Sequence, residues 1–600
     1  MVPTMTSLGS LLFAWRFDAL SAVLAVPALL LLIIAGVYAL PYLDQPRYRE
    51  ESRVRYWLLY ILFGAGILAT LGAKDLLQFL VSWEVMTVAS YVLVAYETHD
   101  ASVLRAAFKY FVMTHVATAC LLLAILLLWA KGGVLDFGAL PDTLARLSVE
   151  SPWLLHTILA LMFVGFATKA GLWPFGDWLP DAHPAAPAPV SAVLSGVMVK
   201  IGLYGFLRFF LWALAPAAPN AAIVWGYVLV AAGVCSAVVG GFAACAASDT
   251  KVLLAYSSVA QSGLISVAIG AGLVLLPTHP ALAQLALLAA LFHTVSDVAV
   301  KGLLFFAAGS VQYRTGSRRL EEMGGLFNAM PVSGWTALIA SLSIAGFPPL
   351  TAFIGKWLML QATVLSTMPL LIAAGLAVLL ASVLSILYAV KFFSAAFLSR
   401  PMRPGRLEVP AAMQGAQVAL AVAVLAMGLA PGYWLGLFST ALQVVPALAT
   451  TAGPSVGVIG VASASGAVMP IILVVGAAWT CVLTLLALGR ARPVRRVETW
   501  MGGAVVAGEM APVISLGFFV PLRDMMHAVY LPLRWHALHR PAWVLPTADA
   551  DRWLFRPAAA QARRLSEALG RLHTGAPHRY IVWQLIGTLL LLLLPILQSR

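Results

Sequence analysis

Charged residues are scarce in this sequence. Of its 600 residues, 10% are charged and 62% are hydrophobic, and the formal net charge is +13. Soluble domains carry about a quarter charged residues. The composition therefore excludes a soluble globular enzyme, a disordered chain and a nucleic-acid-binding domain. In a membrane protein, the excess of Lys and Arg is a signal of topology rather than of an acidic partner.

Cysteine is also sparse, and its spacing excludes several kinds of site. The four cysteines, Cys120, Cys235, Cys245 and Cys481, form no CxxC pair and no Cys/His pattern. Such spacing predicts neither a disulfide framework nor a zinc or iron–sulfur centre. The sequence also lacks a nucleotide-binding loop. We therefore expect the chain to hold no metal and no cofactor, and to perform no redox chemistry itself.

Long apolar runs dominate the chain. A helix crosses the hydrocarbon core with about 20 apolar residues, so these runs predict an all-α, polytopic membrane protein with about fourteen transmembrane helices. The breaks within 56–96 and 332–359 are short or marked by Gly and Pro. The predicted spans are 18–40, 56–73, 76–96, 105–130, 153–173, 187–212, 221–246, 252–275, 282–311, 332–359, 367–398, 413–437, 468–489 and 580–598.

The basic residues between the spans separate onto two sides. Because basic loops face the cytoplasm, we expect a bacterial inner-membrane protein with both termini on the periplasmic side. The sparse side holds only Arg16, Lys74, Lys131, Arg146 and Arg600. The rich side holds the segment 490–579 and, in short loops, Arg47, Arg49, Arg53, Arg55, Arg105, Lys109, Lys251, Arg314, Arg318, Arg319, Arg400, Arg403 and Arg406.

Composition also divides the chain into regions. Residues 1–437 hold closely spaced spans, 438–489 a connector with one more span, 490–579 a linker, and 580–600 the last span. Within the linker, Asp551 to Leu572 is typical of a basic amphipathic helix. We expect it to lie along the cytoplasmic membrane surface, with an ordinary loop as the alternative.

Apart from histidines and the residues at the ends where spans meet loops, eight ionisable residues remain inside the predicted spans. They are Glu84, Lys169, Lys200, Arg208, Asp297, Lys301, Lys356 and Lys391. A charge at mid-membrane costs about 3 kcal/mol on insertion scales, so its default interpretation is a role in ion or proton movement. Arg208 and Lys391 lie near span ends and could instead extend to the interface. Glu84 is a natural partner for Lys169, because a pair of opposite charges is less costly than either charge alone.

Two spans carry backbone breaks beside their lysines. Pro174 follows Lys169, and Pro348 and Pro349 precede Lys356. Proline removes a backbone donor, and broken helices at membrane depth mark ion sites in transporters. A broken span with a lysine, followed by another lysine-bearing span, occurs twice. This pattern suggests a weak inverted repeat, although chance could also produce it.

Three ionisable residues follow one another at intervals of four. His293, Asp297 and Lys301 would share one face of a helix, an arrangement that could form a proton wire. The alternative is a static hydrogen-bonded cluster that holds helices together. The other span-associated histidines, His115 and His156, are more typical of hydrogen-bonded or water-contacting side chains.

Several stretches together resemble the antiporter-like, proton-translocating membrane subunits of respiratory complex I and its relatives. The resemblance covers about 15–437 and implies two inverted repeats with broken helices in the region 1–437. The stretches are Ser82-Trp83-Glu84 to Tyr91, Lys169 to Ala182, Pro187 to Ser191, Lys200 to Gly205, Leu253 to Ser258, Lys301 to Val311, and Pro348 to Lys356.

The resemblance implies a role for each matching residue. Glu84 corresponds to the glutamate that modulates the first key lysine, and Lys169 to that lysine. Lys200 corresponds to the connecting lysine and Lys356 to the terminal one. His293 and Lys301 correspond to members of the central hydrophilic axis.

The sequence also departs from this family. Asp297 stands where members commonly have a second His, and members usually have two more spans before the one near Asp18. The tail from Glu498-Thr499-Trp500 to Pro521-Leu522-Arg523 resembles hydrogenase-4 component B and the formate hydrogenlyase antiporter-like subunit. Met501 stands where these proteins have a cysteine.

The resemblance implies a non-redox, proton-translocating subunit of a complex I-like, hydrogenase-type membrane complex. Its partners would be the lipid bilayer and the other membrane and peripheral subunits of a redox complex, and no nucleic acid. One alternative is a subunit of a multi-subunit sodium/proton antiporter. Others are an ion-coupled solute carrier that works alone and an ion-coupled transporter subunit for inorganic carbon.

Overall fold

A computed structural model describes residues 15–133, 135–398 and 408–448, isolated positions between 480 and 488, and positions 554–561, 563 and 564. The chain divides into two units, Met1–Val544 and Leu545–Arg600. Within the described residues all regular structure is helical and no strand occurs. The prediction of an all-α protein is therefore confirmed.

Among the described residues, eleven helices are long and apolar enough to cross a membrane, which confirms a polytopic membrane protein. These are α2 (Ala19–Tyr42), α3 (Arg53–Leu71), α4 (Leu76–Val94), α5 (Ala101–Gly132), α7 (Pro152–Ala170), the run from α9 to α11 (Ala188–Ala217), α12 (Pro219–Ala246), α13 (Thr250–Leu275), α14 (Pro280–Thr315), α18 with η6 (Pro369–Leu398) and α19 (Ala411–Leu429).

Shorter helices connect or interrupt these spans. The run from α9 to α11 alternates regular and π-helical turns, with its α10 (Val199–Gly205) between η3 (Leu194–Met198) and η4 (Phe206–Leu214). The remaining α-helices are α6 (Leu140–Glu150), α8 (Leu179–Ala185), α15 (Leu326–Ala329), α16 (Pro331–Ala345), α17 (Thr351–Val364) and α20 (Pro431–Leu442).

Two predicted span boundaries are wrong. The span predicted at 332–359 is two helices, α16 and α17, separated by the break around Pro348. The span predicted at 413–437 ends at Leu429, because Pro431 cannot continue the hydrogen-bond ladder and starts α20 instead. The predicted spans 468–489 and 580–598 lie largely outside the described residues, as does most of the linker 490–579. The described positions within Asp551 to Leu572 are helical.

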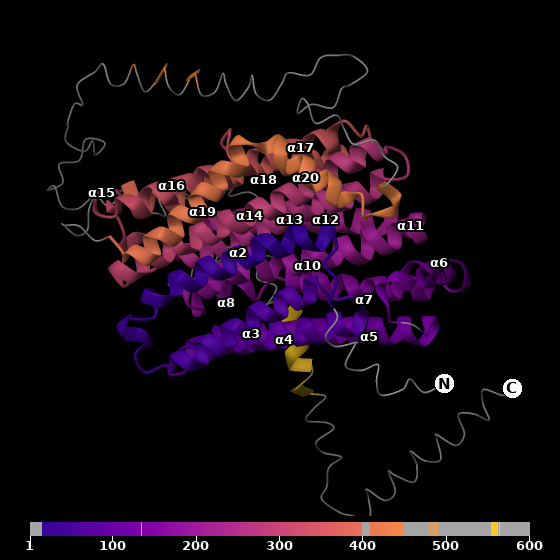
Figure 1. The fold of residues 1–600 in the computed structure, drawn as a ribbon, viewed down its shortest axis with the longest axis horizontal. Coiled ribbons are helices and arrows are strands. Elements are labelled where there is room, and N and C mark those ends of the chain that lie inside the picture. Colours follow the sequence, from indigo (N-terminus) through magenta and orange to yellow (C-terminus); the bar gives the residue numbers. More distant parts are fainter. Residues whose placement is uncertain are drawn as a thin grey trace, which may run out of the picture. The chain divides into compact units, whose positions relative to one another are not determined.

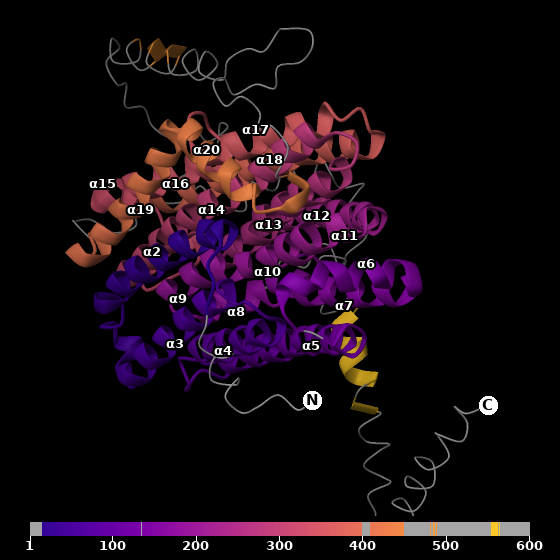
Figure 2. The ribbon, with the colours of Figure 1, turned by 45° about the vertical axis from the view of Figure 1, so that its right-hand side comes forward.

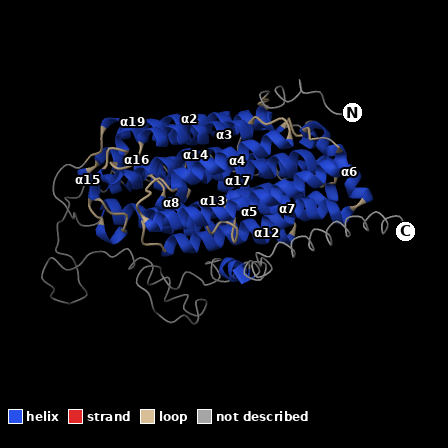
Figure 3. Cartoon of the chain, turned by 90° about the horizontal axis from the view of Figure 1, so that it is seen from below, coloured by secondary structure: helices blue, strands red, loops and turns tan. Residues whose placement is uncertain are grey.

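Contacts between loops define the two ends of the helix bundle in the first unit. At one end, Arg47 Nη2 lies 2.5 Å from Glu97 Oε1 and Arg318 Nε lies 3.1 Å from Asp249 Oδ2. We call this the basic end. At the opposite end, the amide of Arg16 donates to the carbonyl oxygen of Gly72. Arg47, Arg318 and Arg319 line one pocket, so the loops that carry them lie at the same end. Figure 3 shows that the long helices run side by side between the two ends of this bundle.

The centre of the bundle is formed by three fully enclosed spans: α13, α14 and the run from α9 to α11. The early helices α3, α4 and α5 lie on one flank, and α16 to α20 lie on the other (Figures 1 and 2). Helices of the flanks expose apolar side chains such as Leu58, Val88 and Val383. This is the distribution that a lipid environment favours, and the enclosed spans hold Lys200, Asp297 and Lys301.

Glycines allow α12 and α13 to approach closely. A Cβ atom at Gly233 would lie 2.7 Å from the carbonyl oxygen of Gly263, and one at Gly270 would lie 2.5 Å from that of Gly226. Helices in membranes commonly associate through such small residues, because van der Waals packing replaces the hydrophobic effect there. This contact sets the position of α13, which supplies hydrogen-bond partners to the buried charges.

We predict that Gly233→Leu separates α12 from α13 and destabilises the protein, since overpacking typically costs about 1–3 kcal/mol. Thermal unfolding of the detergent-solubilised protein would show a lower midpoint. Gly415→Leu is the matched control, because nothing lies within 4 Å of a Cβ at that helical position. Equal midpoints for the two variants would contradict the packing assignment.

Candidate functional site

An ion pair lies at the centre of the bundle. The ammonium nitrogen of Lys200 on α10 is 2.5 Å from Asp297 Oδ2 on α14, and it also donates to the carbonyl oxygen of Ser195 at 2.8 Å. Both side chains are almost completely buried. In a medium of low dielectric constant an unpaired charge is very unfavourable. The pair therefore holds the run from α9 to α11 against α14.

The neighbours of Asp297 on α14 both reach across to α13. Lys301 Nζ donates to Ser257 Oγ at 2.5 Å, and His293 Nε2 lies 2.7 Å from Gln261 Oε1. The other ring nitrogen of His293 has no hydrogen-bond partner. Because His293, Asp297 and Lys301 are four residues apart, they face one side of α14, as their spacing predicts. These three residues therefore form a stripe along α14, and its middle member, Asp297, belongs to the central ion pair.

Both predicted breaks have the same backbone structure. α7 ends at Gly171 and α16 at Gly346, each with a positive φ that favours glycine. After each glycine the next amide bonds back to the helix, Leu172 to the carbonyl oxygen of Ala167 and Phe347 to that of Leu342. This is a Schellman ending. A cis proline stands three residues beyond each glycine, at Pro174 and Pro349, and Pro348 precedes the second.

The two broken helices run in opposite directions. Lys109, near the start of α5, contacts Asp177 and Asp181, so the first break continues toward the basic end. Glu408 caps the first amides of α16 and accepts from Arg314 through its backbone carbonyl, so α16 starts at the basic end and runs away from it. The repeated structural unit is therefore inverted in direction.

Lys356 lies on α17, beyond the second break. Its ammonium donates at 3.0 Å to the carbonyl oxygen of Ile344, one of the groups left free where α16 ends. The adjacent Gly355 lies against His293, where a Cβ would be 2.6 Å from the ring nitrogen Nδ1. Glycine at this position allows α17 to approach α14. Lys356 is therefore held beside the His293 end of the stripe.

Lys169 is buried at the last turn of α7, before the first break. Its ammonium donates to Thr87 Oγ1 at 2.7 Å and lies over the rings of Trp83 and Tyr110 at 5.4 and 5.9 Å. The expected direct pairing with Glu84 is absent. Glu84 stands one turn from Thr87 on α4 and lies 3.4 Å from His115 on α5 instead. Thr87, rather than Glu84, therefore accepts the hydrogen bond of the lysine.

Arg208 and Lys391, the two residues near span ends, both have partners within the protein. The guanidinium of Arg208 lies 2.7 Å from Asp18 Oδ2, which is the N-cap of α2, and also bonds Tyr204 and Ser21. Lys391 donates at 2.8 Å to the carbonyl oxygen of Cys245 in the last turn of α12. The geometry gives both residues partners inside the bundle.

Two histidines near these buried charges, His115 and His183, are not among the site residues that the sequence predicts. His115 and Glu84 have side chains that are 32% and 29% exposed on the flank formed by α4 and α5. His183, beyond the first break, is fully buried, and neither ring nitrogen has a hydrogen-bond partner. The sequence did offer a sign of His183. It directly follows Asp181-Ala182, at the end of a stretch that resembles the antiporter-like subunits.

The fold and this site define a polytopic membrane protein that encloses a row of ionisable side chains next to two broken helices. The chain belongs to the NADH:quinone oxidoreductase/Mrp antiporter family, whose model of the transmembrane region matches residues 73–385. It is an antiporter-like membrane subunit of the complex I and hydrogenase type. The resemblance found in the sequence is thereby confirmed.

Individual relatives agree with this assignment. The chain is 36% identical over 343 residues to "Hydrogenase-4 component B" of Escherichia coli K12, covering 57% of this chain and 50% of that protein. It is 31% identical over 471 residues to "Formate hydrogenlyase subunit 3" of the same organism, covering 73% of each chain.

A solved structure agrees as well. A chain of the membrane-bound sulfane sulfur reductase, an archaeal respiratory membrane complex, superimposes with a TM-score of 0.76 at 26% identity, covering 96% of this chain and 89% of that one. The relatives are subunits of larger complexes, which implies partner subunits for this chain.

We predict that Asp297→Asn destabilises the protein strongly. Breaking a buried pair by removing one partner costs about 3–5 kcal/mol, because Lys200 must then lose its proton or stay unpaired. Glu322→Gln is the control, since its partner Arg319 is 57% exposed and such pairs contribute about 0–1 kcal/mol. Thermal unfolding should also show recovery in Lys200→Met/Asp297→Leu. A midpoint for Asp297→Asn equal to that of Glu322→Gln would rule out this role.

Proposed function

We propose that this chain moves protons through the membrane along a row formed by Glu84, Lys169, Lys200, His293, Asp297, Lys301 and Lys356, as part of a redox-driven complex of the hydrogenase type. The observation that carries the proposal is the enclosed ion pair between Lys200 and Asp297, continued on both sides by lysines held by neutral partners. The region 1–437 is the translocating domain, and the segments after it are accessory.

Electrostatics gives the row its mechanism. Only one of its four lysines is in direct contact with a carboxylate, and the other three bond hydroxyl or carbonyl oxygens. A proton gained at one site repels positive charge at the next, and this repulsion is strong where water is excluded. A change at one end of the row can therefore load or release protons further along it.

Energy has to enter from another subunit. The proposal assigns electron transfer to partner subunits, since the relatives of this chain are membrane subunits of larger complexes. Glu84 and His115 provide a place of contact, because both are partly exposed on a flank that also exposes apolar side chains such as Val88 and Val112. A partner subunit that covers Glu84 and His115 would shield both side chains from the lipid hydrocarbon.

The basic end of the bundle indicates orientation. Since basic loops stay on the cytoplasmic side, we place the loops of Arg47 and Arg318 in the cytoplasm of a bacterial cell, with the chain in the inner membrane. The first helix, α2, then starts on the periplasmic side. For the carboxyl terminus we keep the expectation from the sequence, which is the periplasmic side.

A subunit of a multi-subunit sodium/proton antiporter is the alternative, since the family includes such proteins. Sodium is a hard cation that prefers several oxygen ligands, as other hard cations do. Asp297 is the one carboxylate in the enclosed part of the row, and Lys200 occupies it. This arrangement favours protons.

We predict that Lys169→Ala and Glu84→Ala abolish proton movement while the complex still assembles. The complex should be purified with its partner subunits and reconstituted into liposomes, with electron transfer and internal pH recorded together. Lys131→Ala, at an exposed position of α5, is the control and should pump normally. Full pumping by both row variants would refute the relay.

The same liposomes separate the two candidate functions. We expect electron transfer to drive acidification equally in sodium and in choline buffers. A strict requirement for sodium, with no bound redox partner in the purified complex, would favour the antiporter instead.

A further inference from the structure

A pocket of about 300 Å³ opens at the basic end of the bundle, and the row described above does not use it. Its lining includes Arg47, Asp249, Gln312, Arg318 and Glu322. Arg47 pairs with Glu97, and Arg318 pairs with Asp249. The side chains of Arg47 and Arg318 remain about one-third exposed. The pocket is therefore a charged opening that water can enter.

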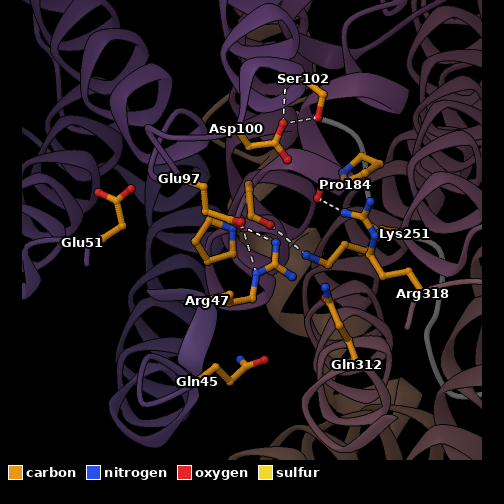
Figure 4. A network of polar contacts seen from close by, with 12 residues as sticks. Gln45, Arg47, Glu51, Glu97, Asp100, Ser102, Pro184, Lys251, Gln312 and Arg318 are labelled. Atoms are coloured by element: carbon orange, nitrogen blue, oxygen red, sulfur yellow. Dashed lines mark hydrogen bonds and ion pairs between the residues drawn. The ribbon is translucent and has the colours of Figure 1, made fainter. Parts of the chain in front are cut away.

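Lys251 lies directly behind this pocket. It stands two residues after Asp249, in the first turn of α13, and it is almost completely buried. Its ammonium donates at 2.8 Å to the carbonyl oxygen of Ala186, where α8 ends, and Arg318 donates to the nearby carbonyl oxygen of Pro184. Figure 4 shows the polar ends of Arg47, Gln312 and Lys251 turned toward one another.

Polar groups lead inward from Lys251. Ser257 lies six residues further along α13, about 9 Å away at the rise of an α-helix, and it bonds Lys301. Its neighbour Ser258 bonds Ser195 at 2.7 Å, and the carbonyl oxygen of Ser195 holds Lys200. The distance from the pocket to the row is thus short enough for a lysine side chain and a bridging water.

His183 lies beside this route and has no hydrogen-bond partner. It is one residue before Pro184, fully buried, and its ring stacks on Phe305 at 4.9 Å between centroids. Phe305 follows Lys301 by one helical turn. A buried imidazole with two unpartnered nitrogens is rare, since buried polar groups are normally bonded. Such a ring can accept a proton from one side and release it on the other.

We propose that the pocket at the basic end is the opening through which protons reach the row, and that Lys251 is the first buried group to carry them. This inference rests on the proposed function. Lys251 releases one proton from its ammonium inward, to His183 or to a water beside it, and then takes one from water in the pocket. Only N–H and O–H bonds form and break, and no electron moves.

The competing interpretation is that Lys251 only caps a helix end. Arginine separates the two, because its guanidinium keeps the charge and the donors but does not release a proton in proteins. Lys251→Arg therefore preserves capping and removes proton transfer. Lys391→Arg is the matched control, since Lys391 is also buried and donates at 2.8 Å to a carbonyl oxygen near a helix end, away from the pocket.

The test uses the whole complex in liposomes, with electron transfer and internal pH recorded together. We expect Lys251→Arg to assemble with an unfolding midpoint close to that of the parent and to lower the proton-to-electron ratio at least tenfold. Lys391→Arg should keep the parent ratio. A normal ratio in Lys251→Arg would overturn the proposal. If Lys169→Ala also pumps normally, the proposed function fails as well; if Lys169→Ala is inactive, only the opening is refuted.

A second measurement tests the proposal even if Lys251→Arg does not fold. Ser317 lines the pocket, and Ser102, at the start of α5, lies at the same end but does not line it. Each is changed to cysteine in a chain whose Cys120, Cys235 and Cys481 are serine, and each is labelled with a bulky methanethiosulfonate before reconstitution. We expect labelled Ser317→Cys to stop pumping and to recover with reductant, while labelled Ser102→Cys pumps. Normal pumping by labelled Ser317→Cys would contradict the opening.

Discussion

A buried charge without a partner is very unfavourable in a membrane protein. At the centre of this bundle, the contact between Lys200 and Asp297 gives each of these two charges a partner. The two residues come from spans that the rest of the bundle encloses. The partners of the neighbouring charges, Ser257 and Gln261, come from the third enclosed span, α13. The glycines between α12 and α13 bring that helix close enough. Packing and electrostatics therefore specify the same arrangement.

The two broken helices extend this arrangement on either side of the central pair. Each ends in a glycine with positive φ, a returning amide and a cis proline, yet the lysines stand on opposite sides of the two breaks. Lys169 lies just before its break, whereas Lys356 lies beyond its own and bonds a carbonyl oxygen that the break leaves free. Because the two helices run in opposite directions, this difference brings both lysines to the same row.

Much of the fold follows from the sequence, because apolar runs of about 20 residues have few alternatives to a membrane helix. The two helix breaks could also be predicted from the sequence, since proline and glycine act on the backbone locally. Contacts between helices could not be predicted from the sequence. Residues four apart, such as His293 and Asp297, could be placed on one face. The hydrogen bond of Lys169 to Thr87, and the ion pair of Arg208 with Asp18, depend on how separate helices pack.

The position of Glu84 gives the proposed row a direction. The central members are enclosed, so a partner subunit cannot act on them directly. Glu84 and His115 reach the surface of one flank, while Thr87, one turn along α4, bonds Lys169. A charge placed against that flank would act on Glu84, which stands one helical turn from the hydroxyl that binds Lys169, and the protein interior screens such a charge poorly. A row with both ends enclosed would have no site for energy to enter. The partial exposure of this pair is therefore what the proposed coupling requires.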